Sequence, residues 1–437
     1  MEISVTSERI ALTGEVKIPG DKSISHRAIL CSALARSQST VENLQKSEDV
    51  LNTLKAIQQL GIEVKQTDYR YEILGNGFNG LKKPKDSLYF GNSGTGIRLA
   101  SGIIAWQNFE TELNGDSSLA KRPMKRISEP LISMGANIVL SEDNTPPIKI
   151  SGNLNLSGIS YEMPIASAQV KSAILFASLN AKGKTSITEP FSTRNHTELM
   201  FKQLGLDIEM NGNEITFNGQ NEFEGIKFKV PGDFSSAAFL IVAALITPGS
   251  SILIKDVGLN STRIALLEVL KSMKANIEIN NKRKVGEEDI GDIAVRHSDL
   301  IACTVTAELI PNLIDELPIL FIASLFAEGD SKFLGVEELK YKESDRLFSM
   351  QEGLRNLGIE TEYKDDIFLV EGRGTGYLLR DGRVDSFGDH RIAMSFIVAG
   401  LRAKKEIKIN NTECIKTSYP EFIEQMSSLG ANLNESK

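Results

Sequence analysis

The sequence contains only three cysteines and four histidines among its 437 residues. Cys31, Cys303 and Cys414 lie far apart and are odd in number, so they predict neither a disulfide framework nor a paired metal-binding motif. No two histidines are four residues apart, which argues against a zinc site on one helix face. We therefore expect a protein of a reducing compartment.

Long hydrophobic runs are also absent. The longest apolar run, residues 237–246, is about half as long as a membrane-spanning helix requires, and the first residues show no secretory signal. The 49 Lys and Arg residues are outnumbered by 57 Asp and Glu residues, giving a formal net charge of −8. This balance argues against a general nucleic-acid-binding protein. We expect a soluble, cytoplasmic monomer that binds neither membranes nor nucleic acids.

One segment matches a cofactor-binding motif, but the residues after it do not predict the helix that such a motif requires. Residues 75–80, Gly-Asn-Gly-Phe-Asn-Gly, match the dinucleotide-binding pattern, but the residues that follow, 81–86, are a poor helix opening. We interpret the segment as a hairpin turn rather than a cofactor site.

A pattern of an amphipathic helix, a glycine and a short β-branched strand occurs six times. The glycine is typical of a helix that ends in the left-handed conformation. The marker positions, 69 to 84 residues apart, are Gly61, Gly135, Gly205, Lys274, Gly358 and Gly430, with a lysine in the fourth copy. The longest interval contains the charged segment 281–299, which we expect to form an exposed hairpin.

Each copy also contains a helix that is apolar on nearly every face and must therefore be buried on all sides. These predicted helices span residues 28–34, 96–106, 170–179, 236–246, 317–326 and 392–401. The length suits two domains of about 200 residues. We predict an α/β fold with three copies in each domain, helices inside and sheets outside, and a crossover at Pro231-Gly232.

The residues that open these helices are polar, and most copies carry a cation there. The N-terminus of a helix favours anions, because its free N–H groups and its dipole point at the ligand. At the starts of the buried helices these cations are Lys22, Arg27, Arg98, Lys171 and Arg391, and the starts of the amphipathic helices add Arg122, Arg194, Lys342, Arg346 and Lys416. Each contributes roughly 4 kcal/mol to an anion about 4 Å away before desolvation. Several of them together suit a ligand with two or more negative charges.

Asp315 and Glu343 are acids within this basic set. Carboxylates bind anions poorly, so we predict that both transfer protons. Other polar residues receive structural interpretations. We interpret Arg98 as bracing the glycine-rich loop 91–96 and Asp389 as orienting Arg391. We expect His26 and His196 to be hydrogen-bonded scaffold.

Five segments give the chain a resemblance to the 5-enolpyruvylshikimate-3-phosphate (EPSP) synthase family, in family order across the whole chain. They are residues 20–27, 91–98, 122–124, 342–346 and 388–391. The resemblance implies a two-domain inside-out α/β barrel of six βαβαββ-type repeats, with the active site in the interdomain cleft. It places residues 19–227 in the N-terminal domain and 1–18 with 228–437 in the C-terminal domain.

The family transfers the enolpyruvyl group of phosphoenolpyruvate to the 5-hydroxyl of shikimate 3-phosphate and releases phosphate, without a metal or organic cofactor. By resemblance, phosphoenolpyruvate meets Lys22, Gly94, Arg122, Gln169, Arg346, Arg391 and Lys416. Shikimate 3-phosphate meets Lys22, Ser23, Arg27, Ser167, Ala168 through its backbone, Gln169, Arg194, Asp315 and Lys342. The resemblance makes Asp315, Glu343 and Lys22 catalytic and implies a target of glyphosate.

One position departs from the family pattern. Many relatives have a second serine where this chain has Ala168, so one hydroxyl contact to the sugar phosphate is missing. Lys171 and Arg194 resemble a divergent branch of the family, and we expect them to compensate from the side.

Two alternatives stay open at this point. The sister enzyme that acts on UDP-N-acetylglucosamine shares the fold but typically has a cysteine in the loop that here reads 115–121, which contains none. A non-enzymatic binder of phosphorylated sugars would need the cations but would have no use for Asp315 and Glu343.

Overall fold

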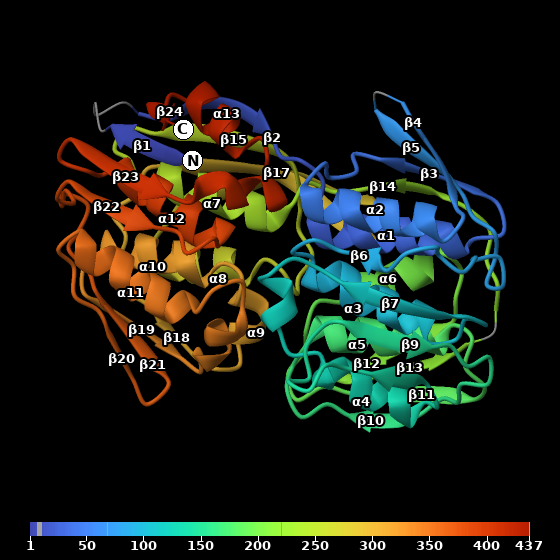
Figure 1. The fold of residues 1–437 in the computed structure, drawn as a ribbon. Helices are drawn as coiled ribbons and strands as arrows, with labels where there is room; N and C mark the ends of the chain where they lie inside the picture. Colours follow the sequence, from blue (N-terminus) through green and yellow to red (C-terminus); the bar gives the residue numbers. More distant parts are fainter. Residues whose placement is uncertain (7–10, 68, 220, 437) are drawn as a thin grey trace. The chain divides into compact units, whose positions relative to one another are not determined.

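The computed structural model describes residues 1–6, 11–67, 69–219 and 221–436. The chain divides into two compact units (Figure 1). Unit 1 comprises Met1–Pro19, Gly232–Arg283 and Asp289–Lys437, and unit 2 comprises Gly20–Pro231 and Lys284–Glu288. Unit 2 continues four residues past the predicted boundary at 227, because strand β14 (Lys227–Lys229) pairs with strand β3 (Gln38–Glu42) of that unit.

Each unit has its own hydrophobic core, built around the helices that the sequence predicted to be buried. In unit 2 these are α1 (Lys22–Leu34), α3 (Gly94–Ile104) and α5 (Ala168–Ser178). In unit 1 they are α7 (Phe234–Ile246), α10 (Leu317–Leu325) and α12 (His390–Gly400). Within each unit these helices pack against one another, and α3 packs against both α1 and α5. The prediction of helices inside each unit is confirmed.

The described strands form six four-stranded sheets, three in each unit. In unit 2 the strand order of the first sheet is β14-β3-β5 (Arg70–Leu74)-β4 (Glu63–Gln66). That of the second sheet is β6 (Leu88–Tyr89)-β7 (Glu110–Asn114)-β9 (Ile148–Ser151)-β8 (Asn137–Val139). That of the third sheet is β10 (Ser160–Glu162)-β11 (Lys184–Thr188)-β13 (Glu214–Asn218)-β12 (Ile208–Asn211). In unit 1 the strand order of the first sheet is β2 (Thr13–Lys17)-β15 (Ser251–Gly258)-β17 (Glu288–Arg296)-β16 (Asn276–Val285). That of the second sheet is β18 (Thr304–Val305)-β19 (Asp330–Leu334)-β21 (Ile367–Glu371)-β20 (Glu362–Lys364). That of the third sheet is β22 (Gly382–Asp385)-β23 (Glu406–Asn410)-β1 (Glu2–Thr6)-β24 (Leu433–Ser436). In every sheet the first two strands run parallel and the third joins antiparallel.

The amphipathic helices end as the repeat pattern predicted. They are α2 (Glu48–Gln59), α4 (Lys125–Ser133), α6 (His196–Gln203), α8 (Ala265–Ser272), α11 (Arg346–Asn356) and α13 (Phe422–Ser428). The marker residue after each helix is left-handed, with φ between +66° at Lys274 and +112° at Gly430. Glycine adopts this conformation without strain, whereas Lys274 must crowd its Cβ against the backbone. Shorter helices complete the described chain: α9 (Ile310–Leu313) and the 3-10 helices Leu119–Lys121, Glu337–Tyr341 and Thr412–Thr417.

The structure confirms one predicted hairpin and overturns another. Strands β16 and β17 form the hairpin expected around 281–299, but it begins at Asn276, and most residues of β17 are buried, so the expectation that the whole hairpin is exposed is wrong. The hairpin turn predicted for residues 75–80 is wrong, because this segment leaves β5 and leads to β6 in a different sheet. A Cβ at Gly75 would overlap the backbone carbonyl oxygens of Ala35 and Ser32, so glycine here permits close packing onto the end of α1.

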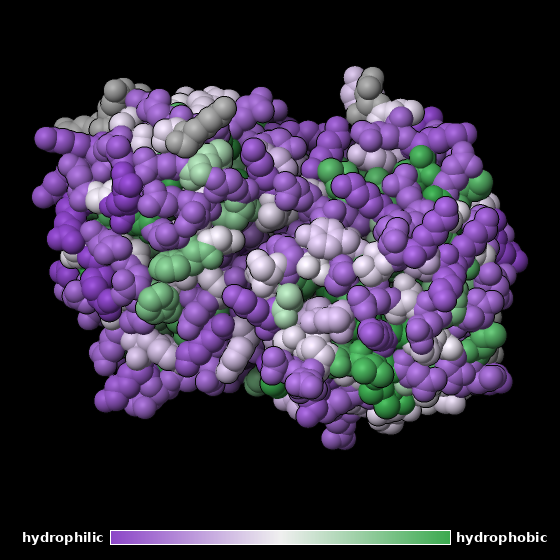
Figure 2. Space-filling model, in the orientation of Figure 1, coloured by the Kyte–Doolittle hydropathy of each residue, from purple (hydrophilic) through white to green (hydrophobic). Residues whose placement is uncertain are grey.

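The face drawn in Figure 2 is mostly hydrophilic, with hydrophobic residues only in small groups. None of the helices in the described part of the chain combines the length and apolar character that crossing a membrane requires.

Candidate active site

Helix α1 of unit 2 begins with Lys22, the first predicted anion-binding residue. Asp21 caps this helix, because its side chain accepts a 2.8 Å hydrogen bond from the backbone N–H of Ile24. The ammonium of Lys22 lies 3.1 Å from a carboxylate oxygen of Asp49, near the start of α2. The cation is therefore held at the N-terminus of α1, where the helix dipole also favours anions.

Arg27 lies one turn further along α1 and is buried. Its guanidinium donates to the hydroxyls of Thr197 and Ser172, both at 2.7 Å, and to the backbone oxygen of Ser23 at 2.9 Å. Burial lowers the pKa of Arg27 to about 10, although Glu198 and Asp21 oppose the shift. Arg27 thus stays charged at neutral pH, and its guanidinium donates to the neutral oxygens of Thr197, Ser172 and Ser23, which suits anion binding.

His26 is fully buried and links α1 to the glycine-rich turn. Its Nδ1 lies 2.8 Å from the hydroxyl of Thr53 and its Nε2 lies 3.2 Å from the hydroxyl of Ser93. Ser93 in turn caps α3 by accepting from the N–H of Gly96 at 2.9 Å. Burial, with Lys22 and Arg27 nearby, lowers the pKa of His26 to about 3, so the imidazole is neutral. The prediction that His26 is scaffold is confirmed.

Arg122, Arg98 and Gln169 gather around Gly94, the first residue of α3. The guanidinium of Arg122 is hydrogen-bonded to Asn92, and that of Arg98 to the side chain of Gln169. Arg98 also donates to the carbonyl of Pro123 at 3.2 Å, so its guanidinium joins Gln169 to the segment before α4, and its predicted bracing of loop 91–96 stays a prediction. A Cβ at Gly94 would lie 3.0 Å from a nitrogen of Arg122 and 3.1 Å from one of Arg98. The absence of a side chain at position 94 therefore leaves room for both cations.

The start of α5 carries Ser167, Ala168 and Gln169. Ser167 caps the helix by accepting from the N–H of Val170 at 3.4 Å. Lys171, one turn along, does not face a ligand site. Its side chain is only 1 % exposed, and its ammonium lies 2.8 Å from Glu189 and 2.7 Å from Glu198. The expectation that Lys171 compensates for the missing hydroxyl of Ala168 is therefore wrong.

In unit 1, three carboxylates surround the buried guanidinium of Arg346. Its Nε lies 2.8 Å from Asp389, and its terminal nitrogens lie 2.5 Å from Glu343 and 3.5 Å from Asp315. Burial alone would lower the pKa of Arg346, but these carboxylates outweigh burial and raise it above its usual value. A permanent cation thus fixes the positions of both predicted acids.

Arg391 and Asp389 open helix α12. The guanidinium of Arg391 donates to the backbone oxygen of Asp315 at 2.7 Å and lies 3.6 Å from the carboxylates of Asp315 and Glu316. Asp389 accepts from the backbone N–H of Arg391 at 2.8 Å, while its other oxygen binds Arg346. Asp389 therefore caps the helix and pairs with Arg346, instead of orienting the guanidinium of Arg391 as predicted.

Two further predicted cations of unit 1 are placed differently. Lys342 is partly buried, its ammonium lies 3.9 Å from Glu338, and burial lowers its pKa. The charges of Asp315 and Glu343 also act on Lys342, which places it beside the acid cluster. Lys416 is exposed in the 3-10 helix Thr412–Thr417 and takes part in none of the ion pairs of this cluster.

Several residues that hold these side chains were not found from the sequence. They are Asp49, Ser172, Glu189, Thr197 and Glu198 in unit 2. Asp49 follows a serine at a helix start, a signal for the helix but not for its contact with Lys22. The others act across 18 to 170 residues of chain, and no local pattern encodes such pairs.

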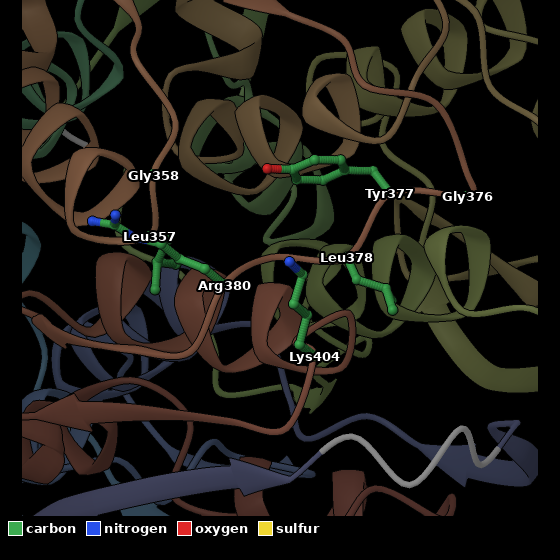
Figure 3. A pocket seen from close by; sticks show the side chains of 7 residues that line it. All are labelled: Leu357, Gly358, Gly376, Tyr377, Leu378, Arg380 and Lys404. Atoms are coloured by element: carbon green, nitrogen blue, oxygen red, sulfur yellow. The ribbon is translucent and has the colours of Figure 1, made fainter.

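A hollow of about 450 Å³ in unit 1 lies apart from all predicted site residues. It is lined by Leu357, Gly358, Gly376, Tyr377, Leu378, Arg380 and Lys404. Figure 3 shows Arg380 beside Leu357 and Gly358, away from Lys404 and Tyr377. Its guanidinium donates to the backbone oxygens of Arg355 and Asn356. Arg380 therefore caps the C-terminus of α11, as a cation favours.

Comparison with known proteins gives a consistent family. The family model described as EPSP synthase (3-phosphoshikimate 1-carboxyvinyltransferase) matches residues 7–426. The chain is 43% identical over 426 residues to a 3-phosphoshikimate 1-carboxyvinyltransferase of Methylococcus capsulatus, covering 97% of each chain. It is 46% identical over 424 residues to one of Coxiella burnetii, covering 97% of this chain and 96% of the other. A solved EPSP synthase of Acinetobacter baumannii aligns over 100% of both chains with a TM-score of 0.89 and 42% identity. This similarity confirms the predicted inside-out α/β fold.

Proposed function

The chain belongs to the EPSP synthase (3-phosphoshikimate 1-carboxyvinyltransferase) family, and from this premise we propose which of its side chains carry out the reaction. The reaction moves the enolpyruvyl group of phosphoenolpyruvate to the 5-hydroxyl of shikimate 3-phosphate and releases phosphate. The chain is a transferase of the shikimate pathway, which leads to chorismate and the aromatic amino acids.

We assign substrate binding to helix starts in both units. The residues proposed for phosphoenolpyruvate are Lys22, Gly94, Arg122 and Gln169 of unit 2, with Arg346, Arg391 and Lys416 of unit 1. Those proposed for shikimate 3-phosphate are Lys22, Ser23, Arg27, Ser167, the backbone of Ala168, Gln169 and Arg194 of unit 2, with Asp315 and Lys342 of unit 1. Both substrates carry several negative charges, which is why cations and free helix N–H groups suit them.

We assign the proton transfers to Asp315, Glu343 and Lys22. Asp315 takes the proton of the 5-hydroxyl of shikimate 3-phosphate while the oxygen of this hydroxyl bonds to the central carbon of phosphoenolpyruvate. Lys22 and Glu343 deliver a proton to the methylene carbon. The tetrahedral adduct then loses a methyl proton and expels phosphate, which restores the double bond. The proton lost from the methyl group returns to the Lys22–Glu343 pair, and the 5-hydroxyl proton held by Asp315 passes to the departing phosphate, so the protons balance.

The observation that carries this proposal is the acid cluster on Arg346. A buried arginine holds the carboxylates of Glu343 and Asp315 at 2.5 and 3.5 Å. A protein that only bound phosphorylated sugars would gain nothing from acids there, because they repel the ligand. The comparisons likewise do not favour the enzyme that uses UDP-N-acetylglucosamine.

The proposal is tested by phosphate release from phosphoenolpyruvate. We expect release with shikimate 3-phosphate as acceptor and none above background with UDP-N-acetylglucosamine. Release with the second acceptor alone, or tight binding of shikimate 3-phosphate without any release, would overturn the assignment.

We also propose that the enzyme acts in the cytoplasm as a monomer, without a nucleic-acid or membrane partner. The net charge of −8 opposes nucleic-acid binding. Sedimentation velocity at assay concentration should give a single species of one chain. A dimer whose dissociation abolished phosphate release would contradict the proposal.

A further inference from the structure

Arg27, Lys171, Glu189 and Glu198 form a buried charge cluster in unit 2. Their exposed fractions are 2%, 1%, 3% and 0%. The ammonium of Lys171 lies 2.8 Å from a carboxylate oxygen of Glu189 and 2.7 Å from one of Glu198. Buried charges are stable only when they are paired, so this cluster is built as a unit of two cations and two carboxylates.

The cluster lies under residues assigned to shikimate 3-phosphate. Lys171 is in the first turn of α5, which begins with Ala168 and Gln169. Glu189 accepts hydrogen bonds from the backbone N–H and hydroxyl of Thr193, next to Arg194. Lys171 also donates to the carbonyl of Thr193 at 3.4 Å. The ammonium therefore ties the start of α5 to the segment that carries Arg194.

Glu198 contacts Lys171 and is next in sequence to a partner of Arg27. It follows Thr197, whose hydroxyl accepts from the Nε of Arg27 at 2.7 Å. The charge of Glu198 opposes the lowering of the pKa of Arg27 by burial. A carboxylate in this place competes with any anionic ligand for the guanidinium of Arg27, unless another cation occupies it. Lys171 is the cation in contact with it.

We propose that Lys171 is a positioning residue. Its ammonium pairs with the carboxylate of Glu198, and this leaves the guanidinium of Arg27 available to an anionic group of shikimate 3-phosphate. The inference rests on the proposed function, in which Arg27 binds that substrate. Without the ammonium, Glu198 pairs with Arg27 and withdraws it from the ligand. This explains why a buried lysine sits one turn behind the ligand-binding start of α5, where its own charge does not reach the substrate.

The test compares Lys171→Met with the double variant Lys171→Met/Glu198→Gln. In the single variant we expect the Kd for shikimate 3-phosphate, measured by calorimetry, to rise about 10- to 100-fold, the effect of losing one contact to a charged group. The kcat at saturating substrate should stay within about threefold. In the double variant the competing carboxylate is gone, so the Kd should return to within about threefold of wild type.

Controls separate this role from a structural one. Lys171→Arg keeps the cation and should keep the Kd, and thermal melting shows which variants fold. A Lys171→Met variant with unchanged Kd, or a double variant that binds as weakly as the single one, would overturn the proposal. If Lys171→Met does not fold, Glu198→Gln alone decides: binding as tight as wild type supports the proposal, and a loss beyond tenfold refutes it. Failure of the proposed function is recognised separately, because the wild type would then release no phosphate.

Discussion

Arg27 of unit 2 and Arg346 of unit 1 are buried cations with different kinds of partner, although Lys22 and Lys171 of unit 2 also pair with carboxylates. In unit 2, the guanidinium of Arg27 is hydrogen-bonded to two hydroxyls and a backbone oxygen, and that of Arg122 to an amide. In unit 1, Arg346 is surrounded by the carboxylates of Asp315, Glu343 and Asp389. Hydroxyl partners leave the charge of Arg27 to a ligand, whereas the charge of Arg346 orients the acids around it. We infer that Arg27 mainly serves anion binding, whereas Arg346, besides its proposed contact with phosphoenolpyruvate, orients two of the residues that transfer protons.

The largest expected effect comes from removing the acids of unit 1. Asp315→Asn and Glu343→Gln should each lower kcat by at least about 100-fold, because a positioned acid or base contributes about 10²–10⁴-fold in rate. Steady-state phosphate release measures kcat, and calorimetry measures whether shikimate 3-phosphate still binds.

Glu352→Gln is the matched control for these acids. Glu352 pairs with the exposed Arg355 on α11, away from Arg346, and its replacement should leave kcat within about twofold. The division between the units fails if Asp315→Asn and Glu343→Gln abolish binding while the residual kcat stays near normal.

The second prediction uses the neutral histidine under the cations of unit 2. The pKa of His26 is lowered from 6.5 to about 3 in the folded protein. Its contribution to stability is therefore complete above pH 6.5 and is lost as the pH falls towards 3, because the unfolded chain then binds the proton first. Between pH 7 and pH 5 the loss amounts to about 2 kcal/mol.

Urea unfolding of wild type and His26→Gln at both pH values measures this loss. Gln cannot take up the proton, so the variant should be less stable at pH 7 but should lose about 2 kcal/mol less on acidification. His297→Gln is the control, since His297 is only half-buried and its Nδ1 lies 2.7 Å from a backbone carbonyl in unit 1. Equal pH dependence in wild type and His26→Gln would contradict the neutral scaffold.

The third prediction concerns Gly94, which stands between two cations of unit 2. The methyl group of Gly94→Ala would lie 3.0 Å from Arg122 and 3.1 Å from Arg98, so both flexible ends must shift by a few tenths of an ångström. Glyphosate is a longer analogue of phosphoenolpyruvate, and we expect it to inhibit the wild type competitively with that substrate. In Gly94→Ala the inhibition constant of glyphosate should rise at least about tenfold, and kcat/KM for phosphoenolpyruvate should fall by a smaller factor.

Inhibition assays at several phosphoenolpyruvate concentrations decide this point. Gly376→Ala serves as control, because a Cβ at Gly376 meets nothing within 4 Å. The prediction is wrong if millimolar glyphosate does not inhibit the wild type. It is also wrong if Gly94→Ala weakens glyphosate inhibition and kcat/KM for phosphoenolpyruvate by the same factor.

The smallest effect compares the helix ends of the two units. Lys274 of unit 1 is left-handed at φ +66°, whereas Gly205 takes the corresponding place in unit 2 at +77°. Lys274→Gly should stabilise the protein by about 0.5–1 kcal/mol and Gly205→Ala should destabilise it by about 1 kcal/mol, because only glycine is unstrained there. A Cβ at Gly205 meets no atom within 4 Å, so the second change reports backbone strain alone. Denaturant midpoints that move the other way would contradict this reading.

The sequence predicted the repeats well because their signals are local. The left-handed residue after a helix and the helix that is apolar on all faces can both be recognised within a few residues of sequence. Lys274 is left-handed as the pattern predicts, although it is not glycine. The partners of the site residues left no such marks. Asp389 binds Arg346 across 43 residues of chain and Arg27 binds Thr197 across 170. Lys171 was misjudged for the same reason, since Glu189 and Glu198 become its neighbours only through folding.

The central claim, that Arg27 binds shikimate 3-phosphate while Glu343 transfers a proton, is tested most directly by one calorimetric comparison. Shikimate 3-phosphate is titrated into Arg27→Gln and into Glu343→Gln, with folding confirmed by thermal melting. The account predicts at least tenfold weaker binding in Arg27→Gln and binding within about threefold of wild type in Glu343→Gln. Tight binding in Arg27→Gln together with lost binding in Glu343→Gln would contradict it.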